Sequence, residues 1–296
     1  MIAIDWVTSS FRAYRLAPDG AVLDKRSAPL GILTVQDGRF DDALASQVGD
    51  WLGAGEAPVV MSGMIGSRQG WKEAPYAVCP AGEQDIAAGL VQVHWGEGHN
   101  AWIAPGLRCR DRSGVPDVIR GEETQLLGVL DELPRQSTWV CLPGTHSKWV
   151  RLEDRRITEF ATYMTGEVFA VLQGHSILGR MMREAPTDAD AFADGVVRAR
   201  DAGGLLHHLF GVRAAGLFGE LADDSSASYL SGLLVGHELA SIPRLSETVY
   251  LLGSERLTGL YVEALAACGI SALVLDPDAV VKGLFRLSAA LPKESP

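Results

Sequence analysis

The stretch TWVCLPGTHSKWVRL, residues 138–152, decides the fold. An apolar run at 138–142 is typical of a buried strand, and it leads into a loop of small and polar residues at 143–147. A second strand resumes at 148–152. A hairpin loop of this composition offers backbone N–H groups and hydroxyls to an anion without steric bulk, although a single loop of this kind is by default a plain turn.

The chain begins with the same arrangement, in IAIDWVTSSFRAYRLA at residues 2–17. A strand at 2–5 leads into a polar loop at 6–11, and a second strand at 12–17 is followed by a turn at Pro18-Asp19-Gly20 and a third short strand. The two segments share a pattern rather than an identity. This repetition predicts two related halves, whose facing loops could grip the phosphates of a nucleotide.

Periodicity predicts the elements of the remaining chain. A stretch rich in Gly, Pro, Trp and polar residues, 63–80, is too long and irregular for an idle connection and favours a binding loop. No low-complexity linker is present, so two closely packed domains are expected, 1–132 and 133–296, which meet near 131–137. Helices are expected at 41–52, 122–133, 165–182, 189–209, 226–242 and from 255 to a stop at Gly269, and further strands at 58–62, 249–252 and 272–275.

Composition excludes several classes of protein. Of the 296 residues, 47% are hydrophobic and 21% charged, and the net charge of −11 argues against nucleic acid or an anionic membrane as a partner. No run of about 18 apolar residues predicts a membrane span, and the start MIAIDW has no signal-peptide pattern, so a cytoplasmic location is expected. Four scattered cysteines are expected to be reduced.

Familiar catalytic motifs are missing from the sequence. There is no GxGxxG after a strand, no GxxxxGK[ST] and no GxSxG. The histidines at 94, 99, 207 and 208 lack the spacing and partners of a zinc site. The informative features are the two polar loops in matching halves and Gly253-Ser254 before a helix, which favour a phosphate site over plain turns only when taken together. Asp5, at the end of its strand, could hold Mg²⁺ or its waters, while Arg12 and Lys148 could neutralise a phosphoryl group.

Several unusual runs identify a family that the chain resembles. They are GMIGSRQGWKEAPY (63–76), RGEETQLLG (120–128), LPGTHSKW (142–149), MTGE (164–167) and HSILGR (175–180). They resemble 2-dehydro-3-deoxygalactonokinase, a family of the sugar kinase, hexokinase, heat-shock ATPase and actin superfamily. The resemblance runs from Met1 to about residue 285.

The resemblance implies an α/β fold of two ribonuclease-H-like, actin-like ATPase domains with a nucleotide cleft between them. It also implies an activity, the phosphorylation of 2-dehydro-3-deoxy-D-galactonate by ATP and Mg²⁺ at the terminal C6 hydroxyl, in galactonate catabolism.

Nucleotide-binding roles transfer to the two loops and to the segment before the helix at 255. In the first loop, Val7 replaces the family's glycine, so that position is either extended or leaves the phosphates more loosely held. In the second, Leu142 stands where the wider superfamily has an acidic residue, so metal binding should depend on Asp5 and on the phosphates of ATP. Gly253-Ser254 could equally be a simple helix cap. The implied ATP-binding residues are Thr8, Ser9, Ser10, Arg12, Gly144, Thr145, His146, Ser147, Gly253 and Ser254.

Phosphoryl transfer also needs a carboxylate to orient the attacking hydroxyl. In related kinases it lies at the start of a helix before the second loop, which makes Glu122 the first choice, Glu123 the second and Asp117 the third. Asp5 and Lys148 complete the expected catalytic set. Alternatively, both glutamates merely complement the helix dipole.

The acid sugar requires a cation with fork geometry for its carboxylate, and Arg68 is the candidate. Ser67, Gln69 and Glu73 could bind hydroxyls, and Trp71 could stack on the sugar or anchor the loop. Two other hypotheses stay open: a kinase for the gluco epimer or another acid sugar, and a nucleotide- or sugar-binding sensor without catalysis. The sequence also leaves a homodimer open.

Overall fold

A computed structural model describes residues 1–52, 58–96, 98–111, 113–243 and 248–291. The chain divides into two compact units, each built around a β-sheet with helices, so the fold is mixed α/β. Unit 1 comprises Met1–Ser137, Leu152–Phe160 and Asp276–Pro296, and unit 2 comprises Thr138–Arg151 and Ala161–Leu275. Within the described residues, no helix combines the length and apolar character needed to cross a membrane.

The main sheet of unit 1 has six strands in the order β3-β2-β1-β4-β7-β6. Strand β1 pairs antiparallel with β2 and parallel with β4, which sets Asp5 beside Arg12 on one side and beside Ser62 on the other. The strands are β1 (Ile2–Trp6), β2 (Phe11–Leu16), β3 (Val22–Ala28), β4 (Val59–Ser62), β6 (Val91–Trp95) and β7 (His99–Ile103).

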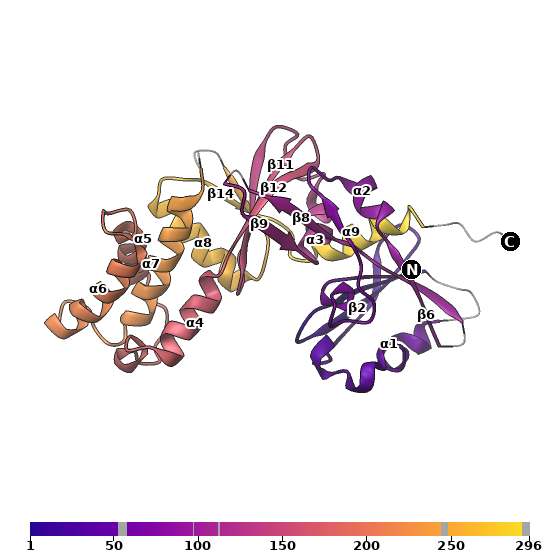
Figure 1. The fold of residues 1–296 in the computed structure, drawn as a ribbon, viewed down its shortest axis with the longest axis horizontal. Helices are drawn as coiled ribbons and strands as arrows, with labels where there is room; N and C mark the ends of the chain where they lie inside the picture. Colours follow the sequence, from indigo (N-terminus) through magenta and orange to yellow (C-terminus); the bar gives the residue numbers. More distant parts are fainter. Residues whose placement is uncertain (53–57, 97, 112, 244–247, 292–296) are drawn as a thin grey trace. The chain divides into compact units, whose positions relative to one another are not determined.

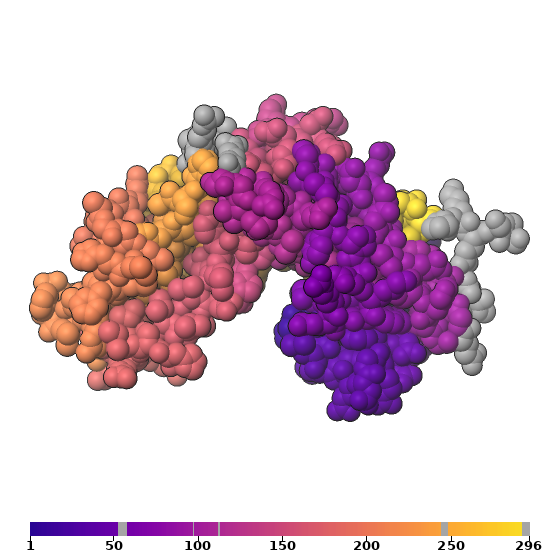
Figure 2. Space-filling model, viewed as in Figure 1, coloured from indigo at the N-terminus to yellow at the C-terminus, as the bar shows by residue number. Residues whose placement is uncertain are grey.

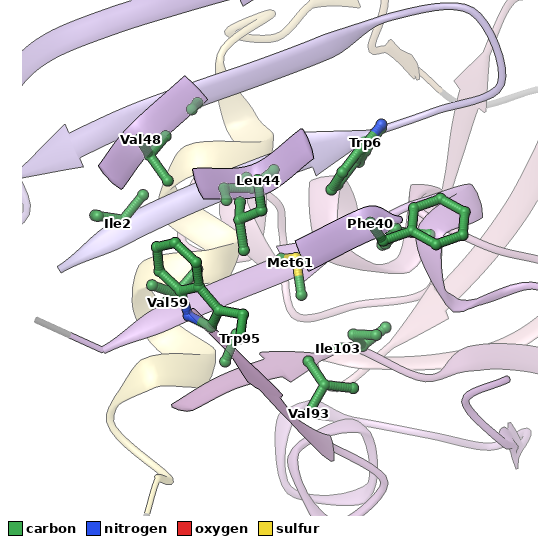
Figure 3. Packing of buried hydrophobic residues seen from close by; sticks show 14 of the residues in the cluster. Ile2, Trp6, Phe40, Leu44, Val48, Val59, Met61, Val93, Trp95 and Ile103 are labelled. Atoms are coloured by element: carbon green, nitrogen blue, oxygen red, sulfur yellow. The ribbon is translucent and has the colours of Figure 1, made fainter. Parts of the chain in front are cut away.

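Helix α1 (Phe40–Val48) covers one face of this sheet because its apolar residues recur every four positions. Phe40, Leu44 and Val48 are buried against strand residues such as Ile2 and Met61, as Figure 3 shows. The apolar area removed from water here is the main stabilisation of the unit. Short 3₁₀ helices flank α1: η1 (Ile32–Thr34), η2 (Gln36–Gly38) and η3 (Gly49–Trp51).

A second, three-stranded sheet in unit 1 joins the stretch that the sequence marked as irregular. Part of 63–80 is in fact regular, because Tyr76–Val78 forms strand β5, parallel to β8. The strand order is β5-β8-β9, with β8 (Gly106–Arg110) and β9 (Pro116–Ile119) antiparallel. The nearby helices are η4 (Met64–Gly66), α2 (Glu83–Ala88) and α3 (Glu122–Val129).

The C-terminal helix α9 (Ala279–Ser288) belongs to unit 1, where the yellow ribbon lies beside α3 (Figure 1). The division therefore differs from the expected domains 1–132 and 133–296. The cause is packing: a Cβ on Gly128 would lie 1.8 Å from the Ala279 carbonyl oxygen, and one on Gly283 would lie 1.8 Å from that of Thr124. Glycines at both contacts let α3 and α9 touch backbone to backbone.

Unit 2 contains most of a five-stranded sheet in the order β12-β11-β10-β13-β14, where β10, β13 and β14 run parallel. Residues Leu152–Phe160, at the end of β11 and in β12, group with unit 1. This order matches β3-β2-β1-β4-β7 of unit 1, so the repeat seen in the sequence recurs as topology. The strands are β10 (Thr138–Leu142), β11 (Ser147–Glu153), β12 (Arg156–Tyr163), β13 (Val249–Leu251) and β14 (Ala272–Val274).

The helices of unit 2 group together, and α6 lies at the surface of the unit in orange (Figures 1 and 2). The single helix expected at 189–209 is wrong, because Gly203 at φ 133° separates α5 from α6. The helices are α4 (Thr165–His175), η5 (Gly179–Met181), α5 (Ala189–Arg198), α6 (Gly204–Phe218), α7 (Ser226–Ser241) and α8 (Glu255–Ala267).

Candidate functional site

The first polar loop joins β1 to β2 and carries a charged pair at its base. The Arg12 guanidinium donates to Oδ2 of Asp5 at 2.5 Å, and the Asp5 side chain is only 3% exposed. Burial raises the pKa of Asp5, Arg12 opposes that shift, and the carboxylate of Glu122 adds to it. Asp5 and Glu122 are therefore close enough to interact electrostatically.

Helix α3 begins beside Asp5 because two glycines allow the backbones to approach. A Cβ on Gly63 would lie 2.8 Å from the Trp6 carbonyl oxygen, and one on Gly121 would lie 3.2 Å from the Cα of Gly63. Both glycines have positive φ, near 95° and 103°. The start of α3 is thereby held next to the end of β1.

The two glutamates that open α3 have different environments. Glu123 is fully buried, and its carboxylate accepts hydrogen bonds from the Gly121 N–H at 2.7 Å and the Thr124 hydroxyl at 3.0 Å. Burial and the charge of Glu122 raise the pKa of Glu123 to about 7. Glu122 is half-buried and accepts from the Arg120 N–H at 3.0 Å. Of the two, only Glu122 reaches solvent, where a substrate could meet it.

The surroundings of the Asp5 carboxylate fit a divalent cation. Within the described chain, its second oxygen, Oδ1, has no hydrogen-bond donor, and the carboxylate of Glu122 is nearby. Mg²⁺ keeps several waters and uses one or two carboxylates together with substrate phosphates. Three or more metal-binding side chains do not cluster anywhere in the described residues. The geometry thus fits a metal that arrives with a nucleotide, not a permanent protein cage.

The rest of the first loop lies open. Thr8 and Ser9 are exposed, and Ser9, Ser10 and Arg12 line a hollow of about 460 Å³ with 27–29 of the next strand. Val7 is not among the described non-glycine residues with positive φ, and its N–H donates to the Ser10 carbonyl at 3.0 Å. Valine therefore occupies the glycine position at no backbone cost.

The expected substrate residues separate into two groups. Ser67, Arg68, Gln69 and Glu73 line one pocket of about 330 Å³, where Arg68 donates to Glu73 at 3.0 Å and is itself 86% exposed. Trp71 lies elsewhere: its ring stacks on Phe40, 6.4 Å between centroids, and packs against the core of unit 1. The indole serves as the anchor of the loop, one of the two roles expected for it. Asp117, the third choice of base, lies on β9 of the small sheet.

The second polar loop, between β10 and β11, is hydrogen-bonded to helix α4. The Glu167 N–H donates to the Thr145 carbonyl at 3.0 Å, and the Glu167 carboxylate contacts the His146 ring. Lys148 is buried, and its ammonium donates to the His146 carbonyl at 2.9 Å. These contacts occupy carbonyls, while the N–H groups of Gly144, Thr145 and His146 have no acceptor in the described part of the chain. The loop therefore presents donors, as an anion site requires.

This loop borders a cavity of about 380 Å³ in unit 2. Gly144 and Thr145 line it together with residues of two helices, which are Thr165 and Gly166 of α4 and Arg256, Leu257, Leu260 and Tyr261 of α8. Ser254 precedes α8 as its N-cap, and a Cβ on Gly253 would lie 3.5 Å from the Pro143 carbonyl oxygen. Gly253 and Ser254 thus lie at the ends of parallel strands β10 and β13, where the positive end of a helix can hold phosphate.

The chain is similar to known proteins over nearly its whole length. The family model of 2-keto-3-deoxy-galactonokinase matches residues 5–287. The chain belongs to the 2-keto-3-deoxy-galactonokinase family. It is 36% identical to 2-dehydro-3-deoxygalactonokinase of Escherichia coli K12, over 96% of each chain. It is 41% identical to a Rhizobium meliloti protein named for the same activity, over 97% of this chain and 95% of that one.

A solved structure supports the fold of this galactonokinase-family chain. The crystal structure of a Sinorhizobium meliloti protein provisionally assigned as a 2-dehydro-3-deoxygalactonokinase superposes with a TM-score of 0.87. The two chains are 40% identical, and the match covers 98% of this chain and 97% of that one. The expected family and the expected α/β fold are confirmed.

Sequence reasoning about the family motifs missed several side chains at these sites. Tyr76 lines the same pocket as Ser67 and Arg68, and the Arg120 guanidinium lies 4.3 Å over its ring while it donates to the Ala74 carbonyl at 2.8 Å. Arg120 thus connects the loop at 63–76 to the start of α3. In unit 2, Tyr261 lines the cavity and Glu238 lies behind it. In the sequence, only the position of Arg120 directly before Gly121-Glu122 indicates that this arginine lies near the site.

Proposed function

We propose that the chain transfers the γ-phosphoryl group of ATP to the C6 hydroxyl of 2-dehydro-3-deoxy-D-galactonate. The observation that carries this proposal is the family match over residues 5–287, which includes every element of both sites. Two physically different sites support it. Unit 1 has a carboxylate pair and a polar pocket, and unit 2 has a cavity beside a loop whose N–H groups at 144–146 meet no acceptor among the described residues.

In this proposal, Glu122 orients and deprotonates the attacking hydroxyl. It is the carboxylate at the start of α3 that is accessible, whereas the oxygens of Glu123 are committed to Gly121 and Thr124. Transfer of a phosphoryl group needs mainly positioning and charge stabilisation, and a single oriented carboxylate is sufficient for the acceptor. Glu123 instead shapes the turn into α3.

ATP is assigned to unit 2, with its phosphates on the N–H groups at 144–146 and at the start of α8. Lys148 and Arg12 supply positive charge for the transferred group. Asp5 would hold Mg²⁺ through Oδ1, either directly or through water. When bound, the metal would neutralise phosphate charge, while Asp5 would fix its place.

The acid sugar is assigned to the pocket of Ser67, Arg68, Gln69 and Glu73. Arg68 is the cation for the substrate carboxylate, because its guanidinium is exposed and its carboxylate partner in the described residues is Glu73 alone. Binding of a substrate carboxylate would compete with that pair. Ser67 and Gln69 would bind hydroxyls of the sugar chain.

The test is an ADP-release assay on the purified full chain with ATP and Mg²⁺. The acceptors are 2-dehydro-3-deoxy-D-galactonate, its gluco epimer, D-galactonate and a neutral hexose. The proposal predicts the highest kcat/KM for the galacto compound and none for the neutral hexose, which lacks a carboxylate. A higher kcat/KM for the gluco epimer would show that this epimer is the substrate. ATP binding without ADP release in the presence of any of the acceptors would show that the protein is a sensor and not a kinase.

A further inference from the structure

A buried carboxylate lies behind the second polar loop, on helix α7. Glu238 is 3% exposed, yet three elements direct donors at it. The Trp149 indole N–H of β11 donates to Oε1 at 2.6 Å, and the Tyr261 hydroxyl of α8 lies 2.9 Å from both oxygens. The Thr165 hydroxyl of α4 donates to Oε2. Burial raises the pKa of Glu238, and these donors oppose that shift by stabilising its charged form.

The directions of these hydrogen bonds connect Glu238 to the loop. The Tyr261 hydroxyl has one hydrogen, and donating it to the carboxylate leaves its oxygen as an acceptor. The Ser147 hydroxyl lies 2.7 Å from that oxygen and is the donor to it. Donation therefore runs from Ser147 through Tyr261 to Glu238, and the Ser147 hydroxyl also stabilises the charged Glu238 carboxylate directly. The Ser147 side chain is fully buried, so its hydroxyl is committed inward and not toward a phosphate.

Burying the charged carboxylate of Glu238 costs folding free energy, and a side chain with a purely structural role would not need a charge. A buried charge is unfavourable by several kcal/mol unless it is fully hydrogen-bonded, and an apolar side chain of similar size often stabilises a core at least as well. The position of the network beside the cavity suggests a functional reason for keeping this buried charge. Tyr261 and Thr165 also line the cavity beside Gly144 and Thr145. The same hydrogen-bond network therefore forms part of the cavity lining and contacts the second polar loop through Ser147.

We propose that Glu238 is a positioning residue for ATP, which acts through Tyr261 and Ser147 to hold the loop at 143–147 in its phosphate-binding conformation. This inference rests on the proposed function, because it takes ATP as the ligand of that loop. Glu238 does not touch the nucleotide; it fixes the two residues that define where the loop N–H groups point.

Tyr261→Phe tests the link, since it removes one hydroxyl and keeps the ring that lines the cavity. We expect the Kd for ATP, measured by calorimetry on the full chain, to rise about tenfold, the effect of losing one hydrogen bond of about 1.4 kcal/mol. The KM for ATP should rise in parallel, while the KM for the acid sugar should not change. Tyr250→Phe, on β13 of the same unit and outside the network, is the matched control and should bind ATP as the parent does.

Ser147→Ala provides a second route to the same bond and keeps the test valid if Tyr261→Phe folds poorly. We expect Ser147→Ala to weaken ATP binding as Tyr261→Phe does, and the double variant to be no worse than either one, because all three lose the same connection. Additive losses would contradict the proposal, since Ser147 would then act on the nucleotide independently. Unchanged ATP affinity in Tyr261→Phe would overturn it outright.

Glu238→Gln tests the acceptor itself while it keeps the shape of the side chain. The amide group presents a donor to Tyr261 or Trp149, so the chain of donation breaks, and ATP affinity should fall at least as far as in Tyr261→Phe. Thermal unfolding establishes that each variant is folded at the assay temperature. A parent chain that fails to bind ATP would refute the proposed function itself, before any variant is compared.

Discussion

Asp5 and Leu142 occupy matching places in the two units, yet they make those places chemically different. Asp5 lies two residues before Val7 at the end of β1, and Leu142 lies two residues before Gly144 at the end of the equivalent strand β10. Asp5 forms a charged pair with Arg12 at the base of the first loop. Leu142 is buried, and the buried carboxylate near the second loop is that of Glu238, which is linked to the loop through Tyr261 and Ser147.

The difference shows how one topology can support two tasks. Both carboxylates are buried, but they are paired differently. Asp5 pairs with the charged guanidinium of Arg12 at the base of its own loop, whereas Glu238 accepts hydrogen bonds from neutral side chains of three other elements. In the proposed assignment, Asp5 serves the metal directly, while Glu238 serves the position of the N–H donors of the second loop. The following substitutions test whether the two loops differ in this way.

Asp5→Asn should have the largest effect, because it removes the charge that distinguishes the first loop. We expect kcat to fall by about 10³-fold, in the range found when a preorganised electrostatic group is lost. Asp24→Asn, an exposed change on β3, is the control and should leave kcat unchanged. Circular dichroism should show both variants folded. Normal turnover in the Asp5→Asn variant would show that the first loop does not need its carboxylate.

Glu123→Gln should change the pH dependence of stability and not the chemistry. An unfolded Glu123 titrates near 4.5 and the folded one near 7, so the folded state holds the extra proton between these values and loses stability as pH rises through them. Glutamine has no such proton. The free energy of unfolding of the variant relative to the parent should therefore rise by on the order of 3 kcal/mol between pH 4.5 and pH 8.

Denaturant titration at several pH values checks this difference. Glu122→Gln should remove part of the same pH dependence, because the charge of Glu122 contributes to the raised pKa of Glu123. A stability difference between Glu123→Gln and the parent that stays constant with pH would contradict the assignment of Glu123 as a buried, protonatable group.

Gly31→Ala and Gly166→Ala test whether both loops depend on close backbone contacts. A Cβ on Gly31 would lie 2.0 Å from the Thr8 carbonyl oxygen, and one on Gly166 would lie 2.7 Å from that of Gly144. Either substitution must displace its loop. We expect the KM for ATP to rise about tenfold in Gly166→Ala, the equivalent of about 1.4 kcal/mol, and kcat to fall more than KM changes in Gly31→Ala.

Two glycines with open surroundings serve as the matched controls. A Cβ on Gly49, or on Gly174 in the same helix as Gly166, would meet no atom within 4 Å. Gly174→Ala should leave kinetics unchanged and stabilise α4 by about 0.5–1 kcal/mol. Equal kinetic losses in Gly166→Ala and Gly174→Ala would mean that the contact between α4 and the loop is unimportant.

Arg68→Ala should have the smallest effect of the series. Its guanidinium is exposed, and surface charge contacts of this kind contribute little, so we expect the KM for the acid sugar to rise about fivefold while the KM for ATP stays constant. Lys72→Ala is the control. Lys72 lies in the same loop as Arg68, and its ammonium donates to the Gln92 carbonyl of β6. A larger effect on ATP than on the sugar would move Arg68 out of the substrate pocket.

Much of this arrangement could be read from the sequence, because local patterns encode it. The loop at 143–147 and its counterpart at 6–11 follow from alternating strands and small residues, and Gly269 ends α8 as expected. The grouping of α9 with unit 1 could not be read, since it depends on Gly128 and Gly283, which meet only in three dimensions.

The supporting residues of the sites were hidden for the same reason. Glu238 looks like an ordinary polar position on a helix, and its donors come from three other elements far along the chain. The sequence ranked Glu122 before Glu123 without a physical reason to separate two adjacent glutamates, and their different burial and hydrogen-bond partners now supply one for the proposal.

The turnover of Glu122→Gln, measured beside that of Glu123→Gln with ATP and 2-dehydro-3-deoxy-D-galactonate, tests the central claim most directly. We predict that kcat of Glu122→Gln falls by about 10²-fold or more, as for the loss of a general base, while its Kd for ATP stays at the parent value. Glu123→Gln should retain most of its turnover at a pH where it is folded. Near-normal kcat in Glu122→Gln together with lost activity in Glu123→Gln would contradict the assignment of the base.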